Sequence, residues 1–344
     1  ASLEVVLASR VVDLDVEDSL SLLRSSGRLR WRVPEVLGPL LEKLGDCTAL
    51  DGMTSGELAA MFYELYRLDM WEPILVDNVL PRLEAQLTVS SPSRKSAANV
   101  LLALAYFSQP RLSLIKRLLH ELLRAQELPH QAIYQVKTFE MAIRVGHLDL
   151  PFEQLGKLAT RWLFSVRGTA TPPETKVESV FANDVSAIAD GICWRHTTEV
   201  EVGPYLLDFA GVMEGDEEVH PYWDDDRPGR SLQQTCVALE ADGPSHFYRP
   251  HGRPWHWTSM SKLRHRLLTA AKIKVAHVPY YDWMKLSNID EKETYLAHLL
   301  INTQRARPMP KPKREVQNNI VNEEPPIVPT LRPGSGARSM SASL

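Results

Sequence analysis

Two carboxylates placed two residues apart mark the stretch of this chain that is best equipped for chemistry. The apolar run CVAL at 236–239 predicts a buried strand, and Glu240 and Asp242 follow it directly. Because side chains at positions i and i+2 of a strand point to the same face, we expect the two carboxylates to lie side by side. Gly243 and Pro244 then end the strand. Like charges so close together need a cation, hydrogen-bond donors or solvent, so this stretch is the candidate site.

Length and composition describe ordinary globular material. The chain has 344 residues, of which 44% are hydrophobic and 24% are charged, which predicts two or more domains with apolar cores. No run of eighteen apolar residues occurs, so no transmembrane helix is expected. The net charge of -4 argues against a protein that coats nucleic acid evenly, but it leaves room for local basic patches.

Cysteine and histidine spacing predicts neither a disulfide framework nor a zinc site. Cys47, Cys193 and Cys236 are far apart in the chain, which favours a reducing compartment inside the cell. The histidines that follow the carboxylates lack compact metal-ligand spacing: His246, His251, His256 and His265. No cofactor is predicted.

Residues 19–164 carry apolar residues at helical spacing, and the pattern repeats with a period of about 39 residues. Each unit predicts two helices, with breaks near Asp69, Gln109 and Gly146. Paired helices at this period favour an α-solenoid, in which each unit buries its apolar stripe on its neighbours. An irregular helical bundle is the alternative. The aligned positions are Leu58, Ala97 and Val136, then Leu65, Leu104 and Ile143, then Leu80, Leu119 and Leu158.

The remainder of the chain predicts a small α/β domain and a tail. Strands are expected at 203–210, 235–241 and 274–279, a basic amphipathic helix within 255–270, and a last helix capped by Asp290 and Glu293. The Pro-, Ser-, Gly- and Arg-rich tail cannot bury a core, so we expect a larger assembly to order it. The expected parts are a helical repeat domain at 1–165, a connector with a helix at 166–202, the α/β domain at 203–302 and an extended tail at 303–344.

Several short motifs in the second half resemble the RAP domain. They are LEADGPSHF at 239–247, a Lys/Arg-rich helix containing Leu267 and Leu268, VPYYDW at 278–283 and the pair Tyr295-Leu296. The RAP domain follows helical repeats in FAST-kinase-like proteins and in octotricopeptide- and heptatricopeptide-repeat proteins of organelles. The resemblance implies a fold similar to that of restriction endonucleases and an organellar RNA-binding protein acting in RNA processing, stability, translation or ribosome structure.

That implied fold gives the carboxylates a second interpretation. In the nuclease form of the fold, acids on two strands hold a metal and a nearby lysine assists. Asp208 and Glu240 match the two acids, whereas Asp242 occupies the position of the lysine. A metal-dependent RNA endonuclease using Asp208, Glu240 and Asp242 is therefore one alternative. The favoured interpretation is a protein without catalytic residues, in which these acids cap turns or pair with arginines.

The charge balance reverses between residues 245 and 285, where cations alternate with aromatic residues. Such cations supply affinity for phosphates, and exposed rings can stack on unpaired bases. Among the aromatic residues, Phe247 and Trp283 are expected to be buried. The predicted RNA contacts are Tyr248, Arg249, Arg253, Lys262, Arg264, Arg266, Lys272 and Lys274, with Lys311, Lys313 and Arg314 in the tail.

The leading hypothesis is a structural component of a mitochondrial ribosome that binds rRNA through its RAP domain and basic tail. Its expected partners are rRNA and neighbouring proteins of a large ribonucleoprotein assembly. A plastid location, a role as a mitochondrial RNA-processing factor or endonuclease, and a protein-interaction scaffold are the alternatives.

Overall fold

The computed structural model describes residues 3–90, 92–125, 127–169, 180–211, 237–248 and 255–305. The expected tail from 306 onward, with Lys311, Lys313 and Arg314, lies outside the described residues, as do Arg249 and Arg253. None of the described helices is both long and apolar enough to span a membrane.

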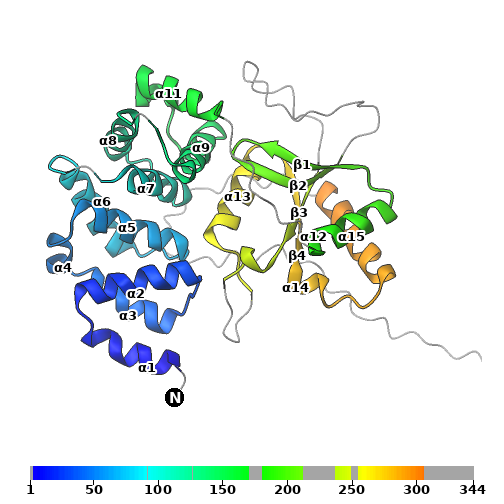
Figure 1. Cartoon of the computed structure of the whole chain (residues 1–344), viewed down its shortest axis with the longest axis horizontal. Coiled ribbons are helices and arrows are strands. Elements are labelled where there is room, and N and C mark those ends of the chain that lie inside the picture. The colour runs from blue at the N-terminus through cyan, green and yellow to red at the C-terminus, as the bar shows by residue number, and fades with distance from the viewer. Residues whose placement is uncertain are drawn as a thin grey trace, which may run out of the picture.

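The N-terminal region is made of helices. It contains α1 (Leu3–Arg10), the 3-10 helix η1 (Val11–Asp13), α2 (Val16–Leu29), α3 (Pro34–Leu44), α4 (Cys47–Asp51), α5 (Ser55–Arg67), α6 (Pro73–Gln86), α7 (Arg94–Tyr106), α8 (Leu112–Leu123), α9 (His130–Arg144), α10 (Phe152–Leu155) and α11 (Lys157–Arg167). In Figure 1 these helices form a stack, in which α2, α5, α7 and α9 pack on one another in sequence order. The helices α3, α6 and α8 each pack against the preceding member of that row.

The turn that ends each helix of this row has the same backbone geometry. Arg30, Asp69, Ser108 and Gly146 have φ of 53°, 53°, 51° and 70°, and they are spaced 39, 39 and 38 residues apart. After each of them, the next backbone N–H donates to a carbonyl five residues earlier, at 2.8 to 3.0 Å. These are Schellman turns, which satisfy the last carbonyls of a helix. The period predicted from the sequence is therefore confirmed in the backbone.

Most of the aligned apolar positions are buried. The columns led by Leu58 and Leu65 lie in the core of the helical region, together with Leu80 and Leu119. Leu158 departs from its column, because its side chain is 70% exposed. The short helix α10 precedes α11 and shifts the register, so that Leu163 takes part in the core instead.

Two of the expected helix starts can be compared with the structure. Thr54 and Glu57 form the predicted capping box of α5, each bonding to the backbone of the other. The predicted cap of the last helix is wrong by two residues. Asn288 accepts a hydrogen bond from the Glu291 N–H at 2.9 Å, so the helix starts before Asp290.

The C-terminal region contains a four-stranded mixed sheet. Its elements are α12 (Val180–Gly191), β1 (His196–Val202), β2 (Tyr205–Gly211), β3 (Val237–Asp242), the 3-10 helix η2 (Pro244–His246), α13 (Ser259–Ala270), β4 (Lys274–Pro279), α14 (Tyr280–Trp283) and α15 (Ile289–Arg305). The strand order is β1-β2-β3-β4, with antiparallel pairs except for the parallel pair β3-β4. The sequence prediction missed β1 and placed its residues in the connector.

Helices cover both faces of β3, the strand that carries the candidate site. Leu239 and Ala241 point into an apolar core shared with α12 and α15. Their alternating neighbours Glu240 and Asp242 face the side of α13, which Figure 1 places between the sheet and the helical stack. Every residue of β3 is buried, so its two carboxylates lie inside the protein and not on its surface.

The left-handed turn residues give a test of the repeat. Gly146 has φ +70° and no atom would approach a Cβ added to it within 4 Å. Gly146→Ala should therefore lower the free energy of unfolding by about 1 kcal/mol through backbone strain alone. Ser108→Gly at the equivalent turn should raise it by roughly 0.5 kcal/mol. Urea denaturation measures both changes, and equal effects of the same sign would contradict a shared turn geometry.

Candidate nucleic-acid interface and its link to the helical region

The paired carboxylates bond to different partners. Glu240 Oε1 accepts a hydrogen bond from Arg264 Nη2 at 2.6 Å. Asp242 Oδ2 lies 2.9 Å from His277 Nδ1, and its Oδ1 lies 3.2 Å from His246 Nδ1. The two side chains share a face of β3 as predicted, and their repulsion is offset by cationic and hydrogen-bonding partners.

Asp208 supports the strand backbone. Its Oδ2 accepts a hydrogen bond from the Ala241 N–H at 2.8 Å, so it stabilises β3 next to the site. Among the residues that the structure describes, no group of three histidine, cysteine, aspartate or glutamate side chains has the arrangement of a metal site. The three acids of the endonuclease alternative are thus separately engaged, by a backbone amide, by an arginine and by two histidines.

Arg264 bonds within the C-terminal region. Besides Glu240, its Nη2 donates to the Leu206 carbonyl at 2.5 Å, and its guanidinium lies 5.6 Å from the centre of the Tyr205 ring. Burial by itself lowers the pKa of Arg264, but the charges of Glu240 and Asp208 outweigh it and raise the pKa above its usual value. The guanidinium predicted to contact RNA is therefore used to hold α13 on the sheet.

Lys262 links α13 to the helical region. Its Nζ donates to Asp69 Oδ2 at 2.7 Å, and only 8% of the lysine and 15% of the aspartate side chain are exposed. The hydroxyl of Tyr106 donates to the same carboxylate, and Arg32 Nη1 lies 3.8 Å from it. Asp69 sits in the left-handed turn after α5, which directs its carboxylate toward three different segments.

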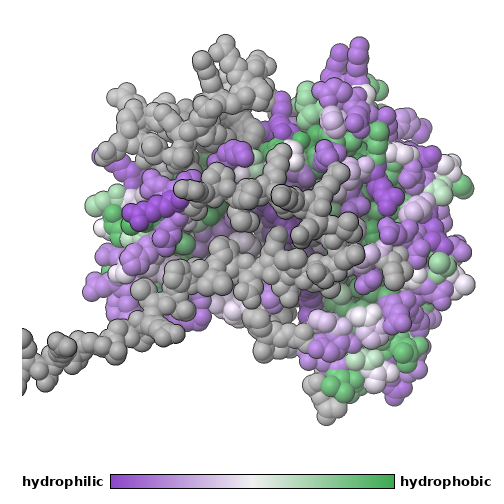
Figure 2. Space-filling model, turned by 180° about the vertical axis from the view of Figure 1, so that it is seen from behind, coloured by the Kyte–Doolittle hydropathy of each residue, from purple (hydrophilic) through white to green (hydrophobic). Residues whose placement is uncertain are grey.

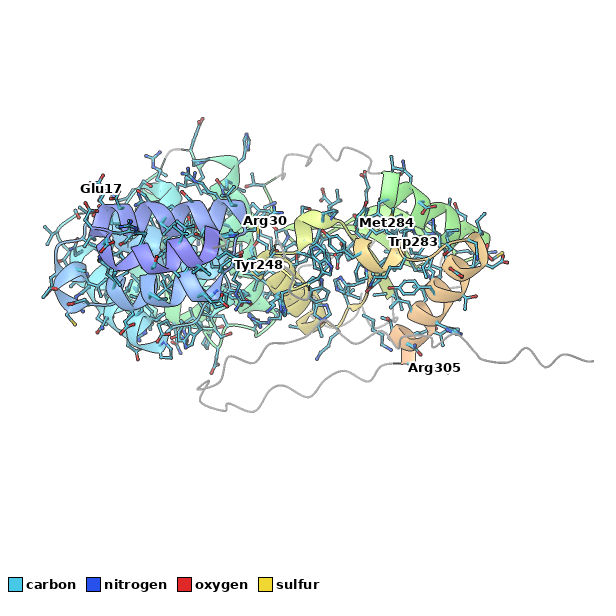
Figure 3. The ribbon with its side chains drawn as sticks, turned by 90° about the horizontal axis from the view of Figure 1, so that it is seen from below. Glu17, Arg30, Tyr248, Trp283, Met284 and Arg305 are labelled. Atoms are coloured by element: carbon cyan, nitrogen blue, oxygen red, sulfur yellow. The ribbon has the colours of Figure 1, made fainter. Side chains whose placement is uncertain are left out.

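Tyr248 forms a second link between the two regions. Its hydroxyl donates to the Arg67 carbonyl at 2.8 Å and accepts from the Ser259 N–H at 3.1 Å. In Figure 3, Tyr248 lies where the helical stack meets α13, and the Arg32 guanidinium lies 5.6 Å from the centre of its ring. Burial, and then the negative charge of Asp69, raise the pKa of Tyr248. Tyr248, which was predicted to contact RNA, is thus buried between the helical region and α13.

The other predicted RNA contacts differ in how accessible they are. Arg266 lies with its guanidinium 5.1 Å from the centre of the Tyr106 ring. Lys274 donates to the Gln304 carbonyl at the end of α15. Lys272 is exposed at the turn that follows α13. Of the predicted contacts within the described residues, Lys272 is the one most open to solvent.

A buried chain of polar side chains lies beside the carboxylates, and the sequence analysis missed it. His277 bridges Asp242 and His265, with 2.9 Å between His277 Nε2 and His265 Nδ1. Trp257 packs on both imidazoles, and its ring centre lies 4.4 Å from that of His277 and 5.4 Å from that of His265. Burial and the neighbouring His277 lower the pKa of His265 to about 3. The alternation of β4 was a signal for this chain, because it places His277 on the same face as Glu240 and Asp242.

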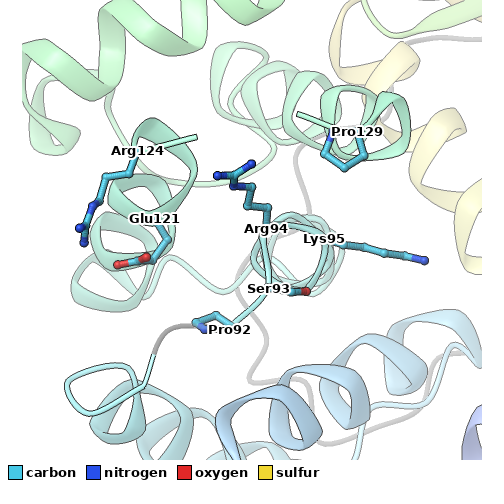
Figure 4. A pocket seen from close by; sticks show the side chains of 7 residues that line it. All are labelled: Pro92, Ser93, Arg94, Lys95, Glu121, Arg124 and Pro129. Carbon is cyan, nitrogen blue, oxygen red and sulfur yellow. The ribbon is translucent and has the colours of Figure 1, made fainter. Parts of the chain in front are cut away.

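A second basic surface lies on the helical region. A hollow of about 660 Å³ is lined by the start of α7, the end of α8 and Pro129. Figure 4 shows its residues, among which three cations accompany the single acid Glu121. The cations are Arg94, Lys95 and Arg124.

The rest of the visible surface is mixed in character. Figure 2 shows hydrophilic residues interspersed with apolar ones over the described part of this face. Val5 and Val6 of α1 and Val12 of η1 are exposed.

Comparison with protein families matches residues 239–299 to the RAP domain. The match begins in β3, just before Glu240, and ends within α15, so it contains α13, the histidine chain and the aromatic residues around them. The RAP domain is generally an RNA-binding domain. No curated protein matches the chain.

The Asp69–Lys262 pair should carry a large part of the contact between the two regions. Lys262→Met leaves the buried carboxylate with one cation fewer and should lower the free energy of unfolding by about 3 kcal/mol. Lys272→Met removes the same charge at an exposed position and should change it by no more than about 0.5 kcal/mol. A double-mutant cycle with Asp69→Asn, followed by urea denaturation, should give a coupling energy of about 1 kcal/mol or more. Additive effects would mean that the pair does not join the regions.

The histidine chain predicts sensitivity to acid. The pKa of His265 is about 3 in the folded chain against 6.5 for an ordinary histidine, so between these values only the unfolded chain binds the proton. His265 should therefore leave stability unaffected well above pH 6.5 and should lower the free energy of unfolding by about 1.4 kcal/mol per pH unit below it. His265→Gln should reduce that slope by about 1.4 kcal/mol per pH unit, because the glutamine binds no proton in either state. Urea denaturation from pH 7.5 to pH 5 gives the slopes, and a wild-type slope retained in His265→Gln would refute the assignment.

Proposed function

We propose that this chain is an organellar RNA-binding protein, and specifically a structural component of a mitochondrial ribosome that contacts rRNA. The observation that carries the proposal is the RAP domain match at residues 239–299, which falls on a folded sheet-and-helix unit. The helical units of about 39 residues in front of it support the same proposal, because the sequence resembles organellar proteins that combine such repeats with a RAP domain.

The folds of the two regions support the same function. The helical region is interpreted as an α-solenoid, since consecutive helix pairs end in equivalent turns and pack on their neighbours. The C-terminal unit is interpreted as a relative of the restriction-endonuclease fold. A plastid is the alternative to a mitochondrion as the location of the protein. The endonuclease alternative has less support, because Asp208, Glu240 and Asp242 are each occupied by a structural partner.

The internal use of α13 changes where RNA contact is expected. Lys262 and Arg264 are occupied by acids of the same chain, so a phosphate would have to displace a buried partner to reach them. Among the described residues, the more accessible cations are the exposed Lys272 and those that line the basic hollow around Arg94. Backbone contacts of this kind confer affinity and salt dependence but little sequence specificity.

Crosslinking in the organelle, followed by sequencing of the attached RNA, tests the proposal directly. Recovery of rRNA fragments supports a ribosomal role, whereas recovery of messenger or precursor RNA favours the processing alternative. Recovery of no RNA above the background of an untagged strain would refute RNA binding in the organelle.

Charge reversal at Lys272 gives a test with purified protein. Lys272→Glu should weaken binding to single-stranded RNA several-fold and reduce the slope of log K against log salt by about 1, because one phosphate contact is lost. Lys157→Glu makes the same charge change at the exposed start of α11 and serves as the control. Fluorescence anisotropy at several salt concentrations measures the slopes. Identical slopes for the two variants would exclude Lys272 from the interface.

A further inference from the structure

Aromatic residues gather beyond the carboxyl ends of β3 and β4. Asp242 at the end of β3 pairs in register with Pro279 at the end of β4, and Tyr280 and Tyr281 follow immediately. Trp255 joins them from the segment before α13. In α/β proteins, the carboxyl ends of parallel strands are a frequent place for ligands, because the chain segments that leave them are free to vary.

Trp255 and Tyr281 are stacked face to face. Their ring centres are 3.3 Å apart and their planes differ by 9°. The buried Phe247 supports both rings edge-on, at 6.2 Å from Trp255 and 5.6 Å from Tyr281. Tyr280 meets Tyr281 edge-on at 5.4 Å. These edge-on contacts therefore fix the positions of the two stacked rings against the core of the domain.

Most other aromatic residues of the RAP segment differ from these rings, and Tyr295 is the exception because it is also partly exposed. Phe247, Tyr248, Trp257 and Trp283 are buried. Trp255, Tyr280 and Tyr281 are half-exposed.

The polar groups of the partly exposed rings differ from those of the buried rings in their hydrogen bonding within the described part of the chain. The hydroxyl of Tyr248 and the Nε1 of Trp283 each bond to a neighbour. Within the described part of the chain, no hydrogen bond is found for the Nε1 of Trp255 or the hydroxyls of Tyr280 and Tyr281. A stacked pair at the surface thus combines π-faces with open hydrogen-bonding groups.

We propose that the Trp255–Tyr281 pair is a stacking platform for an unpaired base of a bound RNA strand. The inference rests on the proposed function and adds a site and a substrate class to it, namely single-stranded RNA. A flat base stacks on an aromatic side chain irrespective of its sequence, whereas the bases of a duplex are already stacked on each other. The open indole N–H and phenol hydroxyls can bond to the edge of the base or to its ribose.

Two ionisable side chains lie close to the platform residues in the sequence. Lys285 follows α14 with 72% of its side chain exposed, and its only recorded partner among the described residues is the half-exposed Asp282 at 2.8 Å. His246, next to the supporting Phe247, is 28% exposed. The Lys285 ammonium can exchange its solvent-exposed carboxylate for a phosphate of the same strand at little cost.

The platform predicts a loss of affinity that does not depend on salt. Trp255→Ala and Tyr281→Ala should each weaken binding of an unstructured RNA of roughly 12 nucleotides by about 10-fold, while the slope of log K against log salt stays unchanged. Trp255→Phe keeps a stacking face and should restore most of the affinity. Met284→Ala serves as the control, because it removes an exposed apolar side chain three residues after Tyr281 (Figure 3). This variant should bind RNA as the wild type does. Thermal unfolding of each variant reports whether the fold is retained.

Photocrosslinking with 4-thiouridine in the same RNA gives an independent readout on the unaltered protein. Crosslinked peptides that contain Trp255 or Tyr281 support the platform. The proposal is overturned if the wild type binds RNA but Trp255→Ala and Tyr281→Ala bind it equally well, or if crosslinks in the wild type avoid both rings. Failure of the wild-type protein to bind any RNA at about 50 mM salt would instead remove the proposed function itself.

Discussion

The carboxylate of Asp69 joins the helical region to the RAP segment. It receives Lys262 from α13, Tyr106 from α7 and Arg32 from the turn before α3, and all four side chains are largely shielded from water. A buried charge without partners is strongly unfavourable, so the turn after α5, the row of helices and α13 have to come together in one arrangement. Tyr248 adds a hydrogen bond to the Arg67 carbonyl two residues before Asp69.

This junction gives the basic helix α13 a different role from the one its composition indicates. A helix rich in lysine and arginine is typical of a phosphate-binding surface. Here Lys262 pairs with Asp69, Arg264 pairs with Glu240, and Arg266 lies against Tyr106. Its cations thus connect the sheet to the helical stack, and this is why the proposed RNA contacts are the exposed Lys272 and the rings beyond the ends of β3 and β4.

The period of the helical repeat was predictable because local rules determine it. Apolar spacing, the capping box at Thr54 and left-handed turn residues all act within a few positions of the chain. The same is true of the shared face of Glu240 and Asp242 and of the burial of Phe247 and Trp283. By contrast, β1 was missed, because its alternating polar residues face solvent at a sheet edge and resemble a connector.

The sequence by itself determined the two kinds of architecture, the repeat length and the RAP motifs, because these depend on periodicity and short-range spacing. Only the tertiary structure decided which charges are paired. Lys262 and Asp69 are 193 residues apart, and Arg264 and Glu240 are on different elements, so no local pattern connects them. Burial then determines their role: a cation desolvated against a carboxylate is costly to remove from that partner, whereas a cation left in water can bind a phosphate without such a cost. The stretch around Glu240 is therefore a buried structural centre, in which Arg264 and His277 bond to the two carboxylates of β3.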